Sequence, residues 1–289
     1  MKERFKNLSL FALFSLATIC CNDDLNLDIP EPDDTIVIDG WIESGQFAKV
    51  LLTRNSPYFS TIDSASIRAL VLTWAKVTLT DSAGEKSEIL TLRRNDDYFP
   101  PYIFEGNEIT GDTGKIYKIT AEYGGKTAWA YTTIPPEVKL DTIYFKLEPN
   151  NDSLGSINIE FTDPPEIKNY YRILTKLIGK DHRYNSLMVM SIDDIFFSGK
   201  KAELSLSRGP ESFFLSEGNK YYKLGDSVSI KFCTIDKAHF DFWNSFQDEY
   251  LNARNPFASS LSKIKSNVQG DGLGIWGGYG ASYYNFKIK

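Results

Sequence analysis

The stretch "GKIYKITAEYGGKTAWAYTTIPP" (residues 114–136) decides the fold class. Apolar and polar residues alternate on both sides of Gly124-Gly125, and such a period of two is typical of β-strands with one buried face. A Gly-Gly pair between two alternating runs favours a tight hairpin turn. Pro135-Pro136 then ends the second run, because proline cannot continue a sheet ladder. The stretch therefore predicts a β-hairpin followed directly by a boundary.

Short strands with turn residues between them continue in both directions from this hairpin. Aromatic residues make up 14% of the chain, with 16 Tyr and 19 Phe, and these residues pack well on pleated surfaces. Evenly spaced short strands indicate β-sandwiches of the immunoglobulin-like or transthyretin-like kind. We therefore predict an all-β protein with two tandem sandwich domains, residues 35–136 and 137–289.

One segment departs from this pattern, "DKAHFDFWNSFQDEYLNARNP" (236–256). Phe240, Trp243 and Tyr250 recur at helical spacing, and Asp236 is placed to cap the free amides of a first turn. Pro256 disfavours helix at the residue before it. The pattern predicts one amphipathic helix at about 237–254 in the second domain, with its aromatic stripe packed on a sandwich.

Composition limits the classes of function. The formal net charge is −6, and binding to nucleic-acid phosphates needs a basic surface, so we expect no nucleic-acid partner. The chain has three cysteines and two histidines, and two of the cysteines, Cys20 and Cys21, are adjacent near the amino terminus. That leaves only Cys233, so we expect neither a zinc finger nor a disulfide framework.

The amino terminus has the pattern of an export signal. Basic residues precede an apolar run, Leu8 to Ile19, that is too short to span a bilayer as a helix. The run ends at Cys20 and Cys21, which indicates a bacterial lipoprotein whose acylated cysteine becomes the first mature residue. We favour Cys21 as the acceptor, with residues 1–20 as the signal peptide, and keep Cys20 as the alternative. A plain signal peptide with two incidental cysteines is the other interpretation.

Residues 21–34 form an acidic tether. Asp23 and Asp24 follow the cysteines directly, and Pro30 and Pro32 make the segment extended and polar. In Bacteroidota, acids at this place resemble the export signal that sends lipoproteins to the outer face of the outer membrane.

A candidate recognition loop lies within "RRNDDYFPPYIFEGNEITGD" (93–112). Its rings surround a Pro-Pro pair and cannot all face inward from one strand, and exposed aromatic rings mark recognition surfaces. The alternative is an inter-strand loop packed by its own rings. The four residues concerned are Tyr98, Phe99, Tyr102 and Phe104.

No arrangement of residues predicts catalysis. A nucleophile needs a neighbouring base, and neither His182 nor His239 accompanies a nucleophile-elbow motif. Gly272, Gly274 and Gly277 match the dinucleotide fingerprint formally, but no helix follows them, so we expect a closing strand there. We predict no catalytic residue, no metal site and no cofactor. Whether the acid clusters at strand ends bind calcium stays open.

Several landmarks together carry a family resemblance. They are the acidic segment after the cysteines with "LDIPEPDDTIVIDGWIESG" (27–45), "TRNSPYF" (53–59), the hairpin at 114–136, the aromatic helix and "NVQGDGLGIWGGYG" (267–280). In this order they resemble a family of Bacteroidota outer-membrane lipoproteins known as domain of unknown function 4249. Its members are often encoded beside TonB-dependent receptors.

The resemblance implies an accessory role in uptake. We expect a lipid-anchored outer-membrane protein that faces the cell exterior and acts as a non-enzymatic binding subunit beside a TonB-dependent β-barrel, with an unknown ligand. A free-standing adhesin or structural lipoprotein is the alternative, and a carboxylate-based hydrolase is a third interpretation.

Overall fold

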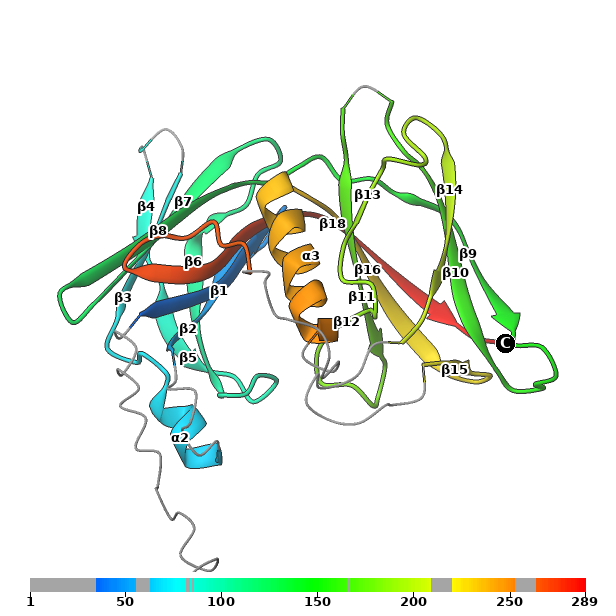
Figure 1. The fold of residues 1–289 in the computed structure, drawn as a ribbon, viewed down its shortest axis with the longest axis horizontal. Coiled ribbons are helices and arrows are strands. Elements are labelled where there is room, and N and C mark those ends of the chain that lie inside the picture. Colours follow the sequence, from blue (N-terminus) through cyan, green and yellow to red (C-terminus); the bar gives the residue numbers. More distant parts are fainter. Residues whose placement is uncertain are drawn as a thin grey trace, which may run out of the picture. The chain divides into compact units, whose positions relative to one another are not determined.

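The last strand of the chain, β18 (Gly272–Lys287), organises the fold. Its first half pairs in parallel with β1 (Ile36–Glu43), from Ile36 beside Gly272 to Glu43 beside Tyr279. Its second half pairs antiparallel with β16 (Ser227–Ile235), from Ile235 beside Tyr279 to Ser227 beside Lys287. Figure 1 shows this strand, in red, running from β1 to β16. A closing strand was expected here, and the structure adds that it contributes to both sandwiches.

The structure is a computed structural model that describes residues 35–55, 63–81, 84, 86–165, 167–208, 220–252 and 264–289. All of these residues belong to one compact unit, Asp33–Lys289. Their strands form three sheets, and the prediction of an all-β, sandwich-like protein is confirmed.

The largest sheet has nine strands and runs through both halves of the chain. Its order is β12-β11-β16-β18-β1-β2-β6-β5, and β13 also pairs with β11. Besides those already bounded, its strands are β2 (Phe47–Arg54), β5 (Thr91–Arg94), β6 (Tyr102–Thr110), β11 (Tyr170–Leu177), β12 (Asn185–Ser186) and β13 (Ile192–Asp193).

A smaller sheet covers each half of the large one. The five-stranded sheet has the order β17-β8-β7-β3-β4, and the other joins β14, β10 and β15, with β9 on β10. Their strands are β3 (Lys76–Asp81), β4 (Ser87–Ile89), β7 (Ile116–Tyr123), β8 (Lys126–Thr133), β17 (Gln269–Gly270), β9 (Leu140–Leu147), β10 (Leu154–Thr162), β14 (Lys201–Leu206) and β15 (Tyr222–Lys223).

Each sandwich has its own apolar core. Ile38, Ile119 and Trp276 belong to the first core, and Ile159, Tyr171 and Phe232 belong to the second. Trp276 comes from β18, so the carboxy-terminal strand completes the amino-terminal core. Its indole N–H also donates to the carbonyl oxygen of Tyr117 at 3.1 Å.

The connection between the two halves contains Pro135 and Pro136, where the sequence predicted a boundary. β8 ends at Thr133 and β9 begins at Leu140. β18 passes so close to this connection that a Cβ on Gly278 would lie 2.3 Å from the carbonyl oxygen of Thr133, so glycine is required there. The division into domains at 136 and 137 stays a prediction, since β18 contributes to both sandwiches.

Two helices are present within the described ranges. The helix α3 (Lys237–Asn252) confirms the predicted helix, and Asp236 caps it by accepting from the backbone N–H of His239 at 2.8 Å. The short helix α2 (Ser64–Ala69) was not predicted. It spans too few residues for a periodic pattern, and a capping box between Asp63 and Ser66 fixes its start.

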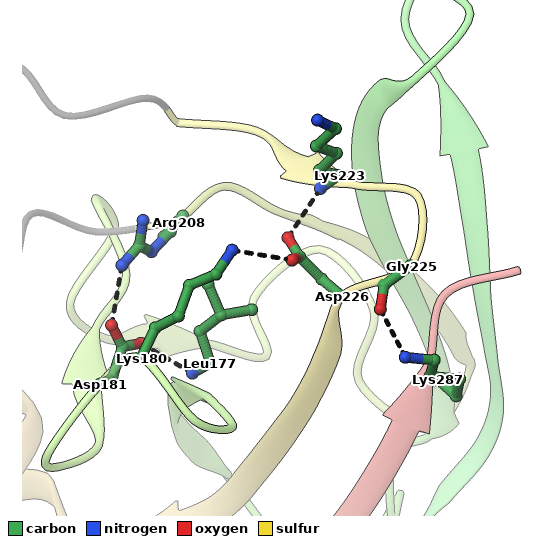
Figure 2. Close-up of polar contacts among 8 residues, drawn as sticks. All are labelled: Leu177, Lys180, Asp181, Arg208, Lys223, Gly225, Asp226 and Lys287. Atoms are coloured by element: carbon green, nitrogen blue, oxygen red, sulfur yellow. Dashed lines mark hydrogen bonds and ion pairs between the residues drawn. The ribbon is translucent and has the colours of Figure 1, made fainter.

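A group of paired charges closes the far end of the second sandwich (Figure 2). The Asp181 carboxylate accepts from the backbone N–H of Leu177 and from Arg208, both at 2.7 Å. The Asp226 carboxylate accepts from Lys180 and from the backbone N–H of Lys223, both at 3.0 Å. We call this group the end cluster. It joins the turns that precede β12 and β16, so these charges serve the fold.

Candidate binding site

The predicted lipidation and export residues, Cys20, Cys21, Asp23 and Asp24, lie outside the described residues, and their roles stay predictions. Among the helices that the structure describes, none is long and apolar enough to span a bilayer.

The four rings of the candidate recognition loop differ in burial. Phe104 is only 3% exposed and packs in the first core, whereas Phe99 is 52% exposed. Tyr102 is half-buried at the start of β6. Tyr98 packs against Trp41 of β1, with 6.1 Å between the ring centroids. A recognition role for this loop stays a prediction, and Phe104 takes part in packing.

Through its contact with Trp41, Tyr98 lies on the side of the large sheet that faces away from the two cores. Along β1, Ile36, Ile38 and Ile42 enter the first core, so Asp39 and Trp41 point to the opposite side. Side chains from β11, β16 and β18 share that side. We call it the concave face, and its members are Asp39, Trp41, Glu43, Tyr98, Arg172, Arg183, Lys231, Tyr279 and Tyr283.

A buried ion pair shows that the sheet bends toward this side. Glu43 is in register with Tyr279 of β18, whereas Lys231 is in register with Tyr283. Four residues of a flat strand span about 13 Å. Nevertheless the Lys231 ammonium and the Tyr283 hydroxyl each donate to the Glu43 carboxylate. The sheet therefore curves enough to bring these positions together, and the pair fastens β1 to β16.

Asp39 lies inside the curve. Its side chain keeps contact with solvent. Desolvation by the surrounding protein nevertheless raises the pKa of its carboxyl group, while the charges of Arg172 and Arg183 act in the opposite direction.

Arg172 lies beneath the surface of the concave face. It is 4% exposed, and its Nε and Nη1 atoms have no hydrogen-bond partner. Its guanidinium stacks on the Trp243 ring of α3, 3.4 Å from the centroid. Burial lowers the pKa of the group, and the charges of Tyr279, Cys233 and Asp39 oppose that shift. A buried guanidinium is costly unless something pairs with it.

In the described part of the chain, the side chains of Asp39, Arg172 and Arg183 make no ion pair or hydrogen bond, although Arg172 stacks on Trp243. The three groups interact only through their charges. The concave face thus holds two cations and one anion that the fold leaves unpaired.

Aromatic side chains border these charges. The rings of Tyr184 and Tyr283 lie 6.0 Å apart edge to face, and Tyr283 is 49% exposed. Desolvation, with a contribution from the charge of Asp39, raises the pKa of Tyr98 to about 12. The Tyr98 phenol therefore stays neutral at physiological pH. The hydroxyl groups of Tyr283 and Tyr184 are already hydrogen-bonded, to Glu43 and to Ser229, so these two residues offer ring faces to a ligand.

Histidine and cysteine take structural positions. The His239 ring is buried against Gly277, where a Cβ would lie 2.2 Å from the ring. Burial and then the charges of Arg172 and Lys231 lower the pKa of His239 well below its usual value, so the ring is neutral. Cys233 is fully buried, and desolvation raises its pKa to about 12. In the described residues no three His, Cys, Asp or Glu side chains are grouped to hold a metal ion.

Sequence reasoning missed most of the concave face. Asp39, Arg172 and Tyr279 come from three strands that are distant in sequence, and each occupies an ordinary position of an alternating strand. The one available signal was the Tyr98 loop, which contributes a ring to the border.

These features define an all-β protein of two sandwiches that share one sheet and carry charged and aromatic groups on its concave side. The model of the family Domain of unknown function (DUF4249) matches residues 22–284, so the chain belongs to that family.

The other comparisons add little. Among solved structures, the chicken interferon gamma receptor alpha chain matches with 9% identity, over 68% of this chain and 86% of that chain. Its TM-score is 0.19, which is too low to indicate a shared fold. No curated protein matches the chain.

Proposed function

We propose that the protein is a non-enzymatic binding subunit, anchored by lipid to the outer membrane, that serves a TonB-dependent uptake or envelope complex from the cell exterior. The observation that carries the proposal is the concave face, where charged groups unpaired by the fold adjoin aromatic rings. Groups of this kind, held by a rigid sheet, favour recognition of a polar ligand.

The membrane location is supported by the amino-terminal sequence. An export signal, two cysteines and Asp23 with Asp24 precede the first strand, which begins at Ile36. A lipid on Cys21 would hold the sandwiches near the membrane through a short tether. Tethering raises the local concentration of the protein, so that weak contacts with a membrane partner become effective.

The partner is proposed from the family resemblance, whose members are often encoded beside TonB-dependent receptors. The adhesin interpretation places the same protein at the same surface without a barrel. The two proposals therefore differ in one observable, the protein that accompanies this chain in the membrane.

The test is an affinity purification of the tagged full chain from detergent-extracted membranes of its native cells, read by mass spectrometry. Cys21→Ala and Cys20→Ala form a matched pair, since the cysteines are adjacent. We expect a TonB-dependent barrel with the natural chain and with Cys20→Ala, and its loss with Cys21→Ala. Recovery of the natural chain without any barrel would overturn the accessory role and favour the adhesin.

A further inference from the structure

The end of the first sandwich at which β1 begins brings together segments that are distant in sequence. The Thr35 backbone N–H donates to the Asn55 side chain at 2.8 Å, and the Asn55 N–H donates to the Thr35 carbonyl oxygen at 3.2 Å. The Leu70 carbonyl oxygen, directly after α2, accepts from the Arg54 N–H at 2.9 Å, so α2 lies at this end as well (Figure 1). Residues 21–34 join the sandwich here, and we call this end the tether end.

A small pocket shows which side chains meet at the tether end. Its volume is about 60 Å³, and residues from β7, β8, the end of β2 and the segments before β1 and β3 line it. They are Thr35, Arg54, Leu72, Tyr123, Gly124 and Lys126. Two cations and a ring that is 37% exposed therefore surround one hollow.

Trp74 projects into solvent beside this pocket. The Ala75 N–H donates to the Leu72 carbonyl oxygen at 3.1 Å, which closes a turn with Trp74 at its corner. The Trp74 side chain is 90% exposed, although Leu72 is buried in the first core. An indole in water lacks the stabilisation that burial provides, so Trp74 gains more from a partner than its neighbours do.

The rings of the tether end suit the boundary between a lipid bilayer and water. Trp and Tyr are enriched at that boundary, because each combines an apolar ring with a polar edge. Trp74 and Tyr123 provide one residue of each type.

The charges of the tether end complement lipid phosphates. Arginine and lysine bind phosphate oxygens through charge-assisted hydrogen bonds, and the pocket is lined by Arg54 and Lys126. Three acids in the described part of this end are engaged within the fold, with a lysine, a backbone amide and the start of α2. They are Glu122, Asp271 and Asp63.

The tether directs this end toward the membrane. The residues from Asn22 to Thr35 reach at most about 50 Å from a lipid on Cys21, even when fully extended. The far edge of the large sheet is held further away, because β13 lies four strand positions from β1, or about 19 Å across the sheet. The tether end is therefore the part of the sandwiches that a lipid anchor keeps nearest the bilayer.

We propose that the tether end lies on the bilayer surface, with Trp74 and Tyr123 in the headgroup region. Arg54 and Lys126 contact lipid phosphates there. This inference rests on the proposed lipid anchor and goes beyond it, because it assigns the end of the molecule that touches the membrane.

Phe196 provides a matched control position. Its side chain is also 90% exposed. The Phe197 N–H donates to the Asp194 carbonyl oxygen at 2.9 Å, so Phe196 occupies the same corner of the same kind of turn as Trp74. It follows β13 in the second sandwich, and it therefore differs from Trp74 in location rather than in exposure.

The experiment reconstitutes the purified full chain into vesicles of phosphatidylcholine and phosphatidylglycerol, with or without brominated phosphatidylcholine. Bromine on the acyl chains quenches the fluorescence of indoles that enter the bilayer. The emission of Trp74→Phe is subtracted from that of the natural chain, which isolates the emission of Trp74. We expect brominated lipid to remove most of this difference.

A double variant, Trp74→Phe with Phe196→Trp, moves the exposed indole to the control position. We expect brominated lipid to leave the emission of that indole unchanged. Thermal unfolding verifies that each variant is folded, and flotation with the vesicles verifies that each is anchored.

Two outcomes would overturn this inference and leave the lipid anchor standing. One is a chain that floats with the vesicles while its Trp74 emission is not quenched, and the other is equal quenching at positions 74 and 196. If Trp74 is not quenched and Trp74→Ser loses the barrel in the affinity purification, the tether end binds a protein instead. A natural chain that does not float with the vesicles would reject the lipid anchor and this inference together.

Discussion

The end cluster and the concave face both gather charged side chains, but they use them differently. In the end cluster, the carboxylates of Asp181 and Asp226 each accept from two donors (Figure 2). On the concave face, the side chains of Asp39 and of the two arginines make no hydrogen bond to any described residue.

This difference in hydrogen bonding distinguishes charged groups that stabilise the fold from charged groups that remain available to bind a ligand. A paired carboxylate loses hydration and gains directed hydrogen bonds in return. The Arg172 guanidinium loses hydration without such a gain, so the folded protein bears a cost there. The buried pair of Glu43 and Lys231 lies on the same face and belongs to the first kind. Stability measurements can test this division.

The largest effect is expected from Glu43→Ala. It leaves the Lys231 ammonium buried without a partner, and it should lower the free energy of unfolding by about 3–5 kcal/mol. Chemical denaturation measures the change. The control is Glu105→Ala in the partly exposed pair with Lys49, for which a loss below about 1 kcal/mol is expected. Equal losses in the two variants would contradict a structural role for the Glu43 pair.

A smaller loss is expected from Asp181→Ala in the end cluster. The change removes acceptors from the Leu177 amide and from Arg208, and it should cost about 2–3 kcal/mol, because the arginine can regain some water. Asp96→Ala breaks an ion pair in which both side chains are mostly exposed, so it should change stability by less than about 1 kcal/mol. If Asp181→Ala unfolds at the same denaturant concentration as Asp96→Ala, the end cluster does not stabilise the fold.

Arg172→Met should act in the opposite direction. Methionine keeps contact with Trp243 without a buried charge, so the free energy of unfolding should rise by about 1–2 kcal/mol. Lys231→Met on the same face is the contrasting variant. It leaves the buried Glu43 carboxylate without its cation, so it should lower the free energy of unfolding. A clear loss of stability in Arg172→Met would show that the guanidinium is structurally paired after all.

The smallest effect is expected from Asp39→Asn. A folded-state pKa above the ordinary value of 3.8 means that the folded protein holds this proton more tightly than the unfolded chain does. The contribution of Asp39 to stability is therefore present below pH 3.8 and is lost as the pH rises through the folded-state pKa. At neutral pH the variant should be more stable by less than about 1 kcal/mol, and the gain should vanish in acid. Thermal unfolding across pH measures it, and a gain that persists below pH 3.8 would contradict desolvation as its cause.

The sequence predicted the local elements of the fold but not the contacts between distant segments. Local signals sufficed for the hairpin at Gly124-Gly125, for α3 and for the closing strand, because turn residues and periodicity act over a few positions. They could not show that Glu43 and Lys231 meet, since that contact depends on the curvature of a sheet assembled from distant segments. Arg172 looked like a solvent-facing residue of an alternating strand, because the helix that covers it comes sixty or so residues later.

The pairing of β1 with β18 also has a consequence for the order of events during biosynthesis. The amino-terminal sandwich lacks a strand and Trp276 until β18 has been made, so it cannot complete its core before then. Contacts of such long sequence separation form slowly. The amino-terminal sandwich is therefore completed only after β18 has been synthesised.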